Sequence, residues 1–338
     1  MQRALLAAVL LATPSVEAAA PRAERGPGPS FLRGMTVSCP RWGEIWGSPD
    51  MALAVEELKS LGVEWISIHP YAGIRRDGAI RFTPAEQTGY LERAVAIAKK
   101  AGVELFWIPH IAYWGSFEWR GEIDFGDDEQ AWDRFFTGYR AWILDQARFA
   151  DRHGLKLLAV GVELEGTTHR KEWISILDEI RYVYRGEITY AANWDRLERV
   201  PFWDRVDQIG VQAYFPVSDR VAPTSDEIDR SWKRNFGRLT ALSKQHGRKP
   251  VLFTEIGYPR SRDAARTPWA PALDQSREVL ALRTKLMETA IEHIEREPIV
   301  RGLFWWKWIP GDDRWDRDFS MRDPEARTVL ERAWRPRS

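Results

Sequence analysis

The sequence predicts a single-domain (β/α)₈ barrel, an α/β fold, and three observations support this fold class. Eight β-rich segments alternate with amphipathic helical stretches over about 300 residues, a length typical of such a barrel. The β-rich segments are nearly continuous apolar runs, which indicates parallel strands covered on both faces. No Gly-rich phosphate-binding fingerprint follows the first segment, which disfavours the alternative of a doubly wound open sheet.

The same patterns place the individual elements along the chain. The expected strands are residues 34–39, 63–68, 103–109, 155–163, 187–193, 208–214, 250–255 and 302–308. The expected helices are residues 51–61, 85–100, 127–153, 171–184, 226–246 and 275–296. The helix after the fifth strand is weak, and only the short segment 202–205 is expected there. No shift in composition after residue 30 indicates a second domain, so residues 31–338 are expected to form the barrel.

The first 30 residues have the pattern of an export signal followed by a tether. Arg3 precedes the apolar run 4–12, and small residues over 16–20 suit a cleavage site. Residues 1–20 are therefore expected to be a signal peptide and residues 21–30 a flexible tether. We therefore expect a secreted or periplasmic protein that does not contact the membrane after cleavage. The alternative is an uncleaved membrane anchor.

Composition excludes several classes of partner and site. Lys and Arg together number 49, equal to Asp and Glu, so no net charge favours nucleic acid or anionic lipid. The single cysteine, Cys39, excludes an internal disulfide or a Cys-rich zinc site, and it is expected to be inert. The 18 tryptophans indicate either a large core or a groove that stacks on flat ligands such as sugars.

Two glutamates are expected at the carboxyl ends of strands, where (β/α)₈ barrel enzymes have their active sites. Glu163 ends the fourth predicted strand and Glu255 ends the seventh. A Glu that closes an apolar strand is costly to bury unless it is paired or used. Retaining glycoside hydrolysis needs two carboxyls about 5–5.5 Å apart, one as acid/base and one as nucleophile. Each Glu alone would suit a salt bridge at the barrel rim, but the pair favours catalysis.

Other strand ends carry residues suited to binding a sugar. Tyr214 is expected to hydrogen-bond Glu255, and Arg41 to supply positive charge. Glu165, two residues beyond Glu163, is a reserve candidate for the acid. Stacking on pyranose rings is expected of Trp114, Trp119 and Trp306, although core packing suits any single Trp equally well. Hydrogen bonds to the sugar or the carboxylates are expected of His69, His110, Asn193 and Tyr258.

The last strand contains two adjacent tryptophans with different expected roles. Successive residues of a strand point to opposite faces, so only one of Trp305 and Trp306 can face the barrel mouth. We expect Trp306 to face the mouth, with Trp308 on the same face, and Trp305 to pack outward against the helices.

Six stretches together resemble the clan A glycoside hydrolases, and most of all glycoside hydrolase family 113, whose described activity is β-mannanase. They are WRGEI (119–123), VGVEL (160–164), YAANW (190–194), IGVQAYFP (209–216), FTEIGY (253–258) and FWW (304–306). The resemblance implies Glu163 as acid/base, Glu255 as nucleophile, Tyr214 beside the nucleophile, and Trp305 or Trp306 as a sugar platform. Many clan A members carry Asn before the acid/base to grip the substrate 2-hydroxyl. Here that residue is Val162, and Asn193 is the candidate replacement.

The expected activity is retaining hydrolysis of a β-linked, mannan-like polysaccharide or oligosaccharide by a monomer without cofactor. One alternative is a carbohydrate-binding barrel that has lost turnover, although such a binder has no need of two glutamates. Another is a metal-dependent hydrolase with His69, His110 and Glu163 as ligands. The chain has only 6 histidines and no closely spaced pair at a strand end, so no metal is expected.

Overall fold

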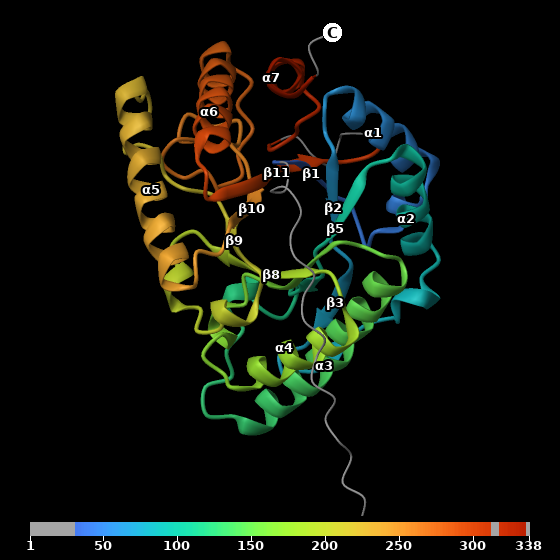
Figure 1. The fold of residues 1–338 in the computed structure, drawn as a ribbon. Helices are drawn as coiled ribbons and strands as arrows, with labels where there is room; N and C mark the ends of the chain where they lie inside the picture. The colour runs from blue at the N-terminus through green and yellow to red at the C-terminus, as the bar shows by residue number, and fades with distance from the viewer. Residues whose placement is uncertain (1–30, 312–317, 336–338) are drawn as a thin grey trace, which may run out of the picture. The chain divides into compact units, whose positions relative to one another are not determined.

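The computed structural model describes residues 31–311 and 318–335, and the predicted signal peptide and tether lie outside these residues. The barrel strands are β1 (Leu32–Val37), β2 (Trp65–Ile68), β5 (Glu104–Trp107), β7 (Leu157–Val162), β8 (Glu187–Asn193), β9 (Gln208–Gln212), β10 (Val251–Ile256) and β11 (Val300–Trp308). All are parallel to their neighbours, and they close in the order β1-β11-β10-β9-β8-β7-β5-β2 (Figure 1). The predicted (β/α)₈ fold is confirmed.

Helices surround the barrel, as Figure 1 shows. They are α1 (Pro49–Ser60), α2 (Tyr90–Ala101), α3 (Glu129–Arg152), α4 (Glu172–Val183), α5 (Ser225–Gln245), α6 (Arg277–Arg296) and α7 (Pro324–Trp334). Short 3₁₀ turns, including Trp203–Arg205, follow the fifth strand in place of an α-helix, as predicted. Within the described residues, none of the helices combines the length and apolarity needed to cross a bilayer.

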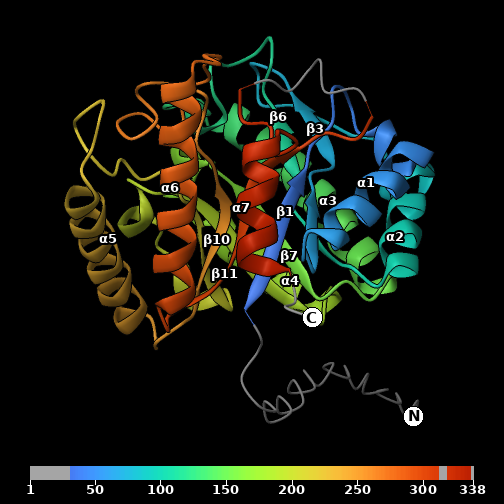
Figure 2. The ribbon, with the colours of Figure 1, turned by 90° about the horizontal axis from the view of Figure 1, so that it is seen from above.

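Helix α7 was not predicted, although its start carries a recognisable pattern. The Asp323 side chain accepts a hydrogen bond from the Ala326 backbone N–H at 2.9 Å, and Pro324 occupies the first turn. Both features are typical of helix starts. Helix α7 completes the outer ring beside α6 (Figure 2).

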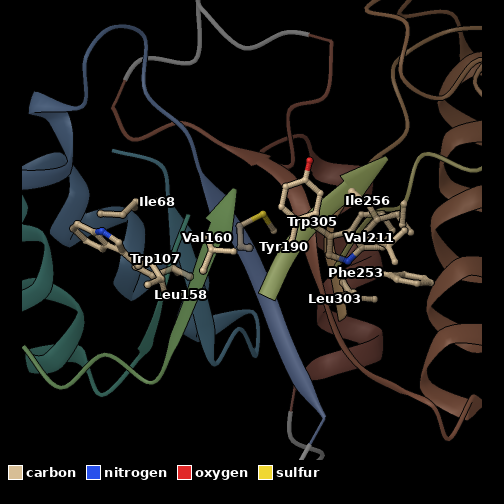
Figure 3. Close-up of a cluster of buried hydrophobic side chains, with 14 of the residues drawn as sticks. Ile68, Trp107, Leu158, Val160, Tyr190, Val211, Phe253, Ile256, Leu303 and Trp305 are labelled. Carbon is tan, nitrogen blue, oxygen red and sulfur yellow. The ribbon is translucent and has the colours of Figure 1, made fainter. Parts of the chain in front are cut away.

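Two apolar layers hold the barrel together. The inner layer fills the barrel, because Phe106 of β5 meets Phe304 of β11 with ring centroids 5.0 Å apart although these strands are not neighbours. The outer layer lies between strands and helices, and Figure 3 shows part of it, including Trp107, Tyr190 and Trp305. Nearly all residues of both layers are inaccessible to solvent, which accounts for the continuous apolar runs in the sequence.

Most of the surplus tryptophan belongs to the core. Among the described residues, the fully buried tryptophans are Trp46, Trp107, Trp132, Trp142, Trp173, Trp203, Trp232, Trp305, Trp308 and Trp334. Three others, Trp42, Trp114 and Trp269, are each about half exposed. Core packing therefore explains most of the tryptophan content, and stacking on a ligand remains a prediction for the exposed members.

A small second sheet stands at the carboxyl end of the barrel and was not predicted. It consists of β3 (Tyr71–Ile74), β4 (Ile80–Arg81) and β6 (His110–Ala112) in the order β4-β3-β6. Figure 2 shows β3 and β6 beyond the ends of the barrel strands. Strands β2 and β5 each lead into this sheet through a short break that contains a proline, a residue that cannot donate a ladder hydrogen bond.

Candidate active site

A cavity of about 670 Å³ opens at the carboxyl ends of the barrel strands. Seven of the expected site residues line it: His110, Trp119, Glu163, Asn193, Tyr214, Glu255 and Trp306. They come from the ends of six different strands or the loops that follow, so only the closed barrel brings them together.

Glu163 directly follows β7 in a backbone conformation that is unusual for a residue with a side chain. Its φ is 51°, in the left-handed region, which costs roughly 1–2 kcal/mol for an L-residue. The Glu163 N–H donates to the Ala191 carbonyl at 2.9 Å, and the Tyr190 hydroxyl accepts from the Leu164 N–H at 2.9 Å. These bonds hold the strained turn, and strain of this kind is typical of functional positions.

Glu255, near the end of β10, is held by hydrogen-bond donors from β9 and the residues just beyond it. The Tyr214 hydroxyl donates to Glu255 Oε2 at 3.0 Å, as predicted. Gln212 also hydrogen-bonds this carboxylate. The Thr254 hydroxyl donates to Gln212 Oε1 at 2.8 Å, so the Gln212 amide N–H₂ is the group that faces Glu255. Donors of this kind stabilise the ionised form of a carboxylate.

The two carboxyls titrate as a pair. Burial, followed by the charge of Glu163, raises the pKa of Glu255 to about 7. Burial also raises the pKa of Glu163, against the lowering effects of the Arg120 charge and a Trp119 hydrogen bond. Since the charge of Glu163 disfavours ionisation of Glu255, the two do not readily ionise together, and the pair keeps one proton up to near-neutral pH.

The positive charge beside these carboxyls comes from Arg120 and not from Arg41. The Arg120 Nη1 atom lies 3.9 Å from Glu163 Oε2, and the Arg120 side chain is largely buried. Arg41 is exposed and does not line the cavity, contrary to expectation. The chain continues past the end of β1 and carries Arg41 outward, whereas the loop after β6 returns Arg120 over the mouth.

Comparison with known proteins identifies the family. Residues 39–318 match the model of Glycoside Hydrolase Family 113. The chain belongs to this family. It is a glycoside hydrolase. A search of curated proteins returned no match.

Solved structures of low sequence identity share the fold. A complex of a GH113 β-1,4-mannanase has 22% identity and a TM-score of 0.78, over 91% of this chain and 100% of that one. A GH113 β-mannanase from Alicyclobacillus acidocaldarius, in complex with ManMIm, has 24% identity and a TM-score of 0.75, over 90% and 97%. A Glycoside Hydrolase Family 5 mannosidase from Rhizomucor miehei has 12% identity and a TM-score of 0.60, over 91% and 95%.

Two histidines stack beneath the family 113 enzyme's cavity wall. The rings of His69 and His110 lie 4.8 Å apart and nearly parallel. Burial lowers the pKa of His69 to about 3 and that of His110 well below its ordinary value, so both rings are neutral. His110 lines the cavity but His69 lies behind it. Among the described residues, no group of three or more His, Cys, Asp or Glu is arranged to hold a metal ion.

The last barrel strand divides its tryptophans as predicted, except for Trp308. Trp306 lines the cavity, whereas Trp305 is fully buried in the outer layer. Trp308 is also fully buried and lies beneath the Arg322 guanidinium, so the expectation that it shares the face of Trp306 is wrong. The pairing of β1 with β11 skips Lys307, and this irregularity shifts Trp308 to the other face and puts Lys307 at the cavity.

Two other expected sugar ligands do not line the cavity. Tyr258 is buried in the outer layer between strands and helices, with its ring 6.4 Å from that of Trp305. Trp114 is 56% exposed and lies outside the cavity. Cys39 is half-buried just beyond β1, and burial raises the pKa of its thiol to about 11, in agreement with an inert role.

Asn193 lines the cavity with its amide already engaged. The Asn193 Nδ2 donates to Glu165 Oε1 at 2.6 Å, and burial raises the pKa of Glu165 to about 7. Glu165 itself does not line the cavity, and Val162 packs in the inner layer of the barrel. Val162 has no side-chain donor, whereas Asn193 Nδ2 carries two N–H groups, of which the bond to Glu165 uses one and leaves the other for a substrate hydroxyl.

Several cavity residues were missed from the sequence. They are Tyr113, Arg120, Trp194, Asp195, Trp269, Pro271, Lys307, Asp318 and Phe319. Trp194 and Asp195 directly follow a predicted strand end, and Arg120 adjoins the predicted Trp119, so position alone indicated these three. Trp269 lies midway along the loop between β10 and α6, and no sequence pattern pointed to it.

Proposed function

We propose that the family 113 enzyme cleaves β-linked, mannan-like polysaccharides or oligosaccharides with retention of anomeric configuration. Glu163 acts as acid/base and Glu255 as nucleophile. The observation that carries the proposal is a coupled pair of buried carboxyls in one cavity, of which Glu255 receives the hydrogen bonds that favour charge. The mannanase and mannosidase relatives support the sugar class.

The proposed reaction has two steps. In the first, Glu163 donates its proton to the glycosidic oxygen while the Glu255 carboxylate attacks the anomeric carbon, and the leaving alcohol departs. In the second, Glu163 takes a proton from water, whose oxygen displaces Glu255 and restores the carboxylate. Arg120 and the donors on Glu255 stabilise the negative charge that moves between the two carboxyls.

The arrangement on Glu255 suits a nucleophile that is displaced again. Tyr214 and Gln212 fix the orientation of the carboxylate towards the cavity, so its rotamer need not reorganise when it attacks. Trp306 offers an aromatic face beside the pair on which the sugar at the cleavage point stacks.

Digestion of soluble β-mannan tests the proposal. Products are analysed by mass, and the first-formed anomer is followed by NMR, with Glu255→Gln as the control without nucleophile. We expect the β-anomer to appear first and mutarotate later. An initial α-anomer would mean inversion, and no turnover of any β-linked polysaccharide in a screen would favour the non-catalytic binding barrel.

We also propose that the mature enzyme is a secreted or periplasmic monomer. The basis is the leader pattern over residues 1–20 and the Pro- and Gly-containing tether over residues 21–30. Cell fractionation with N-terminal sequencing of the exported protein, and its elution volume in gel filtration, test the two parts. A retained leader in the membrane fraction or a dimer-sized species would contradict them.

A further inference from the structure

Two exposed tryptophans and a half-buried tyrosine form a cluster beside the cavity, which we call the outer aromatic cluster: Trp42, Trp114 and Tyr71. Their ring centroids lie 5.9 Å (Trp42 to Tyr71), 6.1 Å (Trp42 to Trp114) and 5.5 Å (Tyr71 to Trp114) apart. Trp42 is 53% and Trp114 56% exposed. Single exposed aromatic residues are ordinary, but two adjoining tryptophans form an apolar patch of the kind that marks a binding site.

The outer aromatic cluster is continuous with the cavity wall. The rings of Trp114 and Tyr113 lie 6.0 Å apart, and those of Tyr71 and His110 lie 6.2 Å apart. Tyr113 and His110 both line the cavity. The small second sheet holds this connection, because Tyr71 of β3 pairs with His110 of β6. A ligand that leaves the cavity on this side meets the cluster next.

A pair of stacked tryptophans lines the cavity mouth on the side opposite the outer aromatic cluster. Trp194 and Trp269 stack with centroids 5.8 Å apart and planes 24° apart, and both line the cavity. Trp194 follows β8 and Trp269 follows β10, so the pair flanks β9. The outer aromatic cluster follows β1, β2 and β6, and is centred on β2. In the order of the closed barrel, β2 and β9 are diametrically opposite.

The catalytic groups give this line of aromatic residues a direction. Trp306, the platform for the sugar at the cleavage point, has its ring 5.8 Å from that of His69, which in turn lies 5.4 Å from Tyr71. The sugar at the cleavage point, stacked on Trp306, therefore adjoins the outer aromatic cluster. The leaving group lies across the scissile bond from that sugar, on the side where Trp194 and Trp269 line the cavity.

We propose that the outer aromatic cluster binds the non-reducing part of a β-linked glycan beyond the sugars held in the cavity, and that Trp194 and Trp269 bind its reducing part. The inference rests on the proposed function. Tryptophan offers a large rigid face, against which the partly positive C–H face of a pyranose packs without losing its hydroxyl hydration. The enzyme then accepts a long chain across the mouth, with one aromatic site on each side of the scissile bond.

The dependence of activity on chain length tests the outer aromatic cluster. The kcat/KM values for mannohexaose and mannotriose are compared in Trp42→Ala, Trp114→Ala and wild type. We expect the hexaose-to-triose ratio to fall about tenfold in each variant, the equivalent of losing 1.4 kcal/mol of binding. Tyr182→Ala is the matched control, because Tyr182 is 92% exposed near the end of α4, away from the mouth.

Both variants are expected to fold, because each removes a half-exposed side chain, and melting temperatures check this. A ratio equal to that of wild type in both Trp42→Ala and Trp114→Ala would overturn the assignment. So would an equal fall in Tyr182→Ala.

The cleavage pattern tests the direction. With mannohexaose labelled at the reducing end, Trp42→Ala should move cleavage towards the non-reducing end, because fewer sugars are then held on that side. Trp269→Ala should move it towards the reducing end. Shifts in the reverse sense, or in one common sense, would overturn the direction.

A binding measurement separates this inference from the proposed function. Calorimetry of mannohexaose with Glu255→Gln, alone and combined with Trp42→Ala, needs no turnover. Weaker binding in the combined variant supports the cluster even if wild type proves inactive, in which case only the proposed function fails. Equal affinity of Glu255→Gln and the combined variant for mannohexaose would contradict a sugar-binding role for the cluster, whether or not the wild type is active.

Discussion

Arg120 donates a hydrogen bond from Nη1 to Nδ1 of His110 at 3.1 Å. Because a guanidinium can only donate, His110 Nδ1 must accept, and the proton of the neutral ring lies on Nε2. This Nε2–H lies 4.0 Å from Glu255 Oε1 and has no hydrogen-bond partner among the residues that the structure describes. One arginine thus orients a donor towards the proposed nucleophile while its own charge faces Glu163.

This relationship predicts the effect of changing Arg120. Its positive charge lowers the pKa of both carboxyls, so Arg120→Gln should raise both pKa values. The alkaline limb of the kcat/KM profile should therefore move to higher pH, with a lower maximum rate because His110 is no longer oriented. Arg120→Lys keeps the charge and should leave the limb closer to wild type. Rate measurements from pH 4 to 9 on soluble β-mannan give the profiles.

Arg41→Gln serves as the control, since Arg41 is the exposed residue first expected to supply the charge. Its pH profile should match that of wild type. If Arg41→Gln moves the alkaline limb and Arg120→Gln does not, the electrostatic assignment is reversed.

The two carboxyl variants should separate the chemical roles. Glu255→Gln removes the nucleophile and should abolish turnover of every substrate. Glu163→Gln removes only proton donation, so the first step should survive with a dinitrophenyl glycoside, whose leaving group needs no proton. The variant should then accumulate glycosyl-enzyme, visible by mass spectrometry, and azide should rescue it to a product of retained configuration. Equal losses in both variants on natural and activated substrates, without azide rescue, would argue against these roles.

Residues on regular stretches of backbone could be predicted from the sequence, and those beyond an irregularity could not. Glu163 and Glu255 were predictable because the carboxyl ends of parallel strands meet at one end of a barrel. The opposite faces of Trp305 and Trp306 followed from the alternation of side chains along a strand. Trp308 was misplaced because the irregular pairing at Lys307 breaks that alternation.

Loop residues were harder to predict, for a physical reason. The position of Arg120 over the mouth depends on the second sheet and on the turn that follows it, and that of Trp269 on a long loop without regular structure. Side chains in a loop have no regular repeat of direction, so the sequence does not indicate which of them point into the cavity. The expectation for Arg41 failed in the same way, since a strand end does not determine where the next four residues go.

The raised pKa of Glu255 predicts how stability depends on pH. In the pair with Glu163, burial and the Glu163 charge raise the pKa of Glu255 to about 7 from an ordinary 4.5, so the folded protein holds the proton that the two carboxyls share more tightly than the unfolded chain does. The resulting stabilisation is complete below about pH 4.5 and is lost as pH rises through 7. Glu255→Gln keeps only the loss that the buried Glu163 causes, which wild type also has. The variant should therefore gain stability relative to wild type between pH 4 and pH 8, with a free energy of unfolding that rises by about 3 kcal/mol against that of wild type.

Denaturant unfolding at the two pH values measures this difference. The buried histidines have lowered pKa values and destabilise the fold as pH falls below about 6.5, but they are present in both proteins and cancel in the comparison. A difference between the two proteins that does not change with pH would show that the Glu255 pKa is not raised.

The adjacent tryptophans of β11 offer a test in which one residue controls for the other. Trp305 is fully buried, with its ring near that of Tyr258, so Trp305→Ala leaves a cavity and should cost about 3–5 kcal/mol of unfolding free energy. Trp306 is partly exposed at the cavity, so Trp306→Ala should unfold much like wild type but lose kcat/KM through the missing sugar platform. Both quantities are measured on both variants, by thermal melting and by initial rates on β-mannan.

A stable but inactive Trp305→Ala would show that the residues face the other way, and full activity in Trp306→Ala would place the sugar platform elsewhere in the cavity. The two substitutions remove the same side chain from neighbouring positions. Opposite outcomes would therefore reflect the direction in which each ring points.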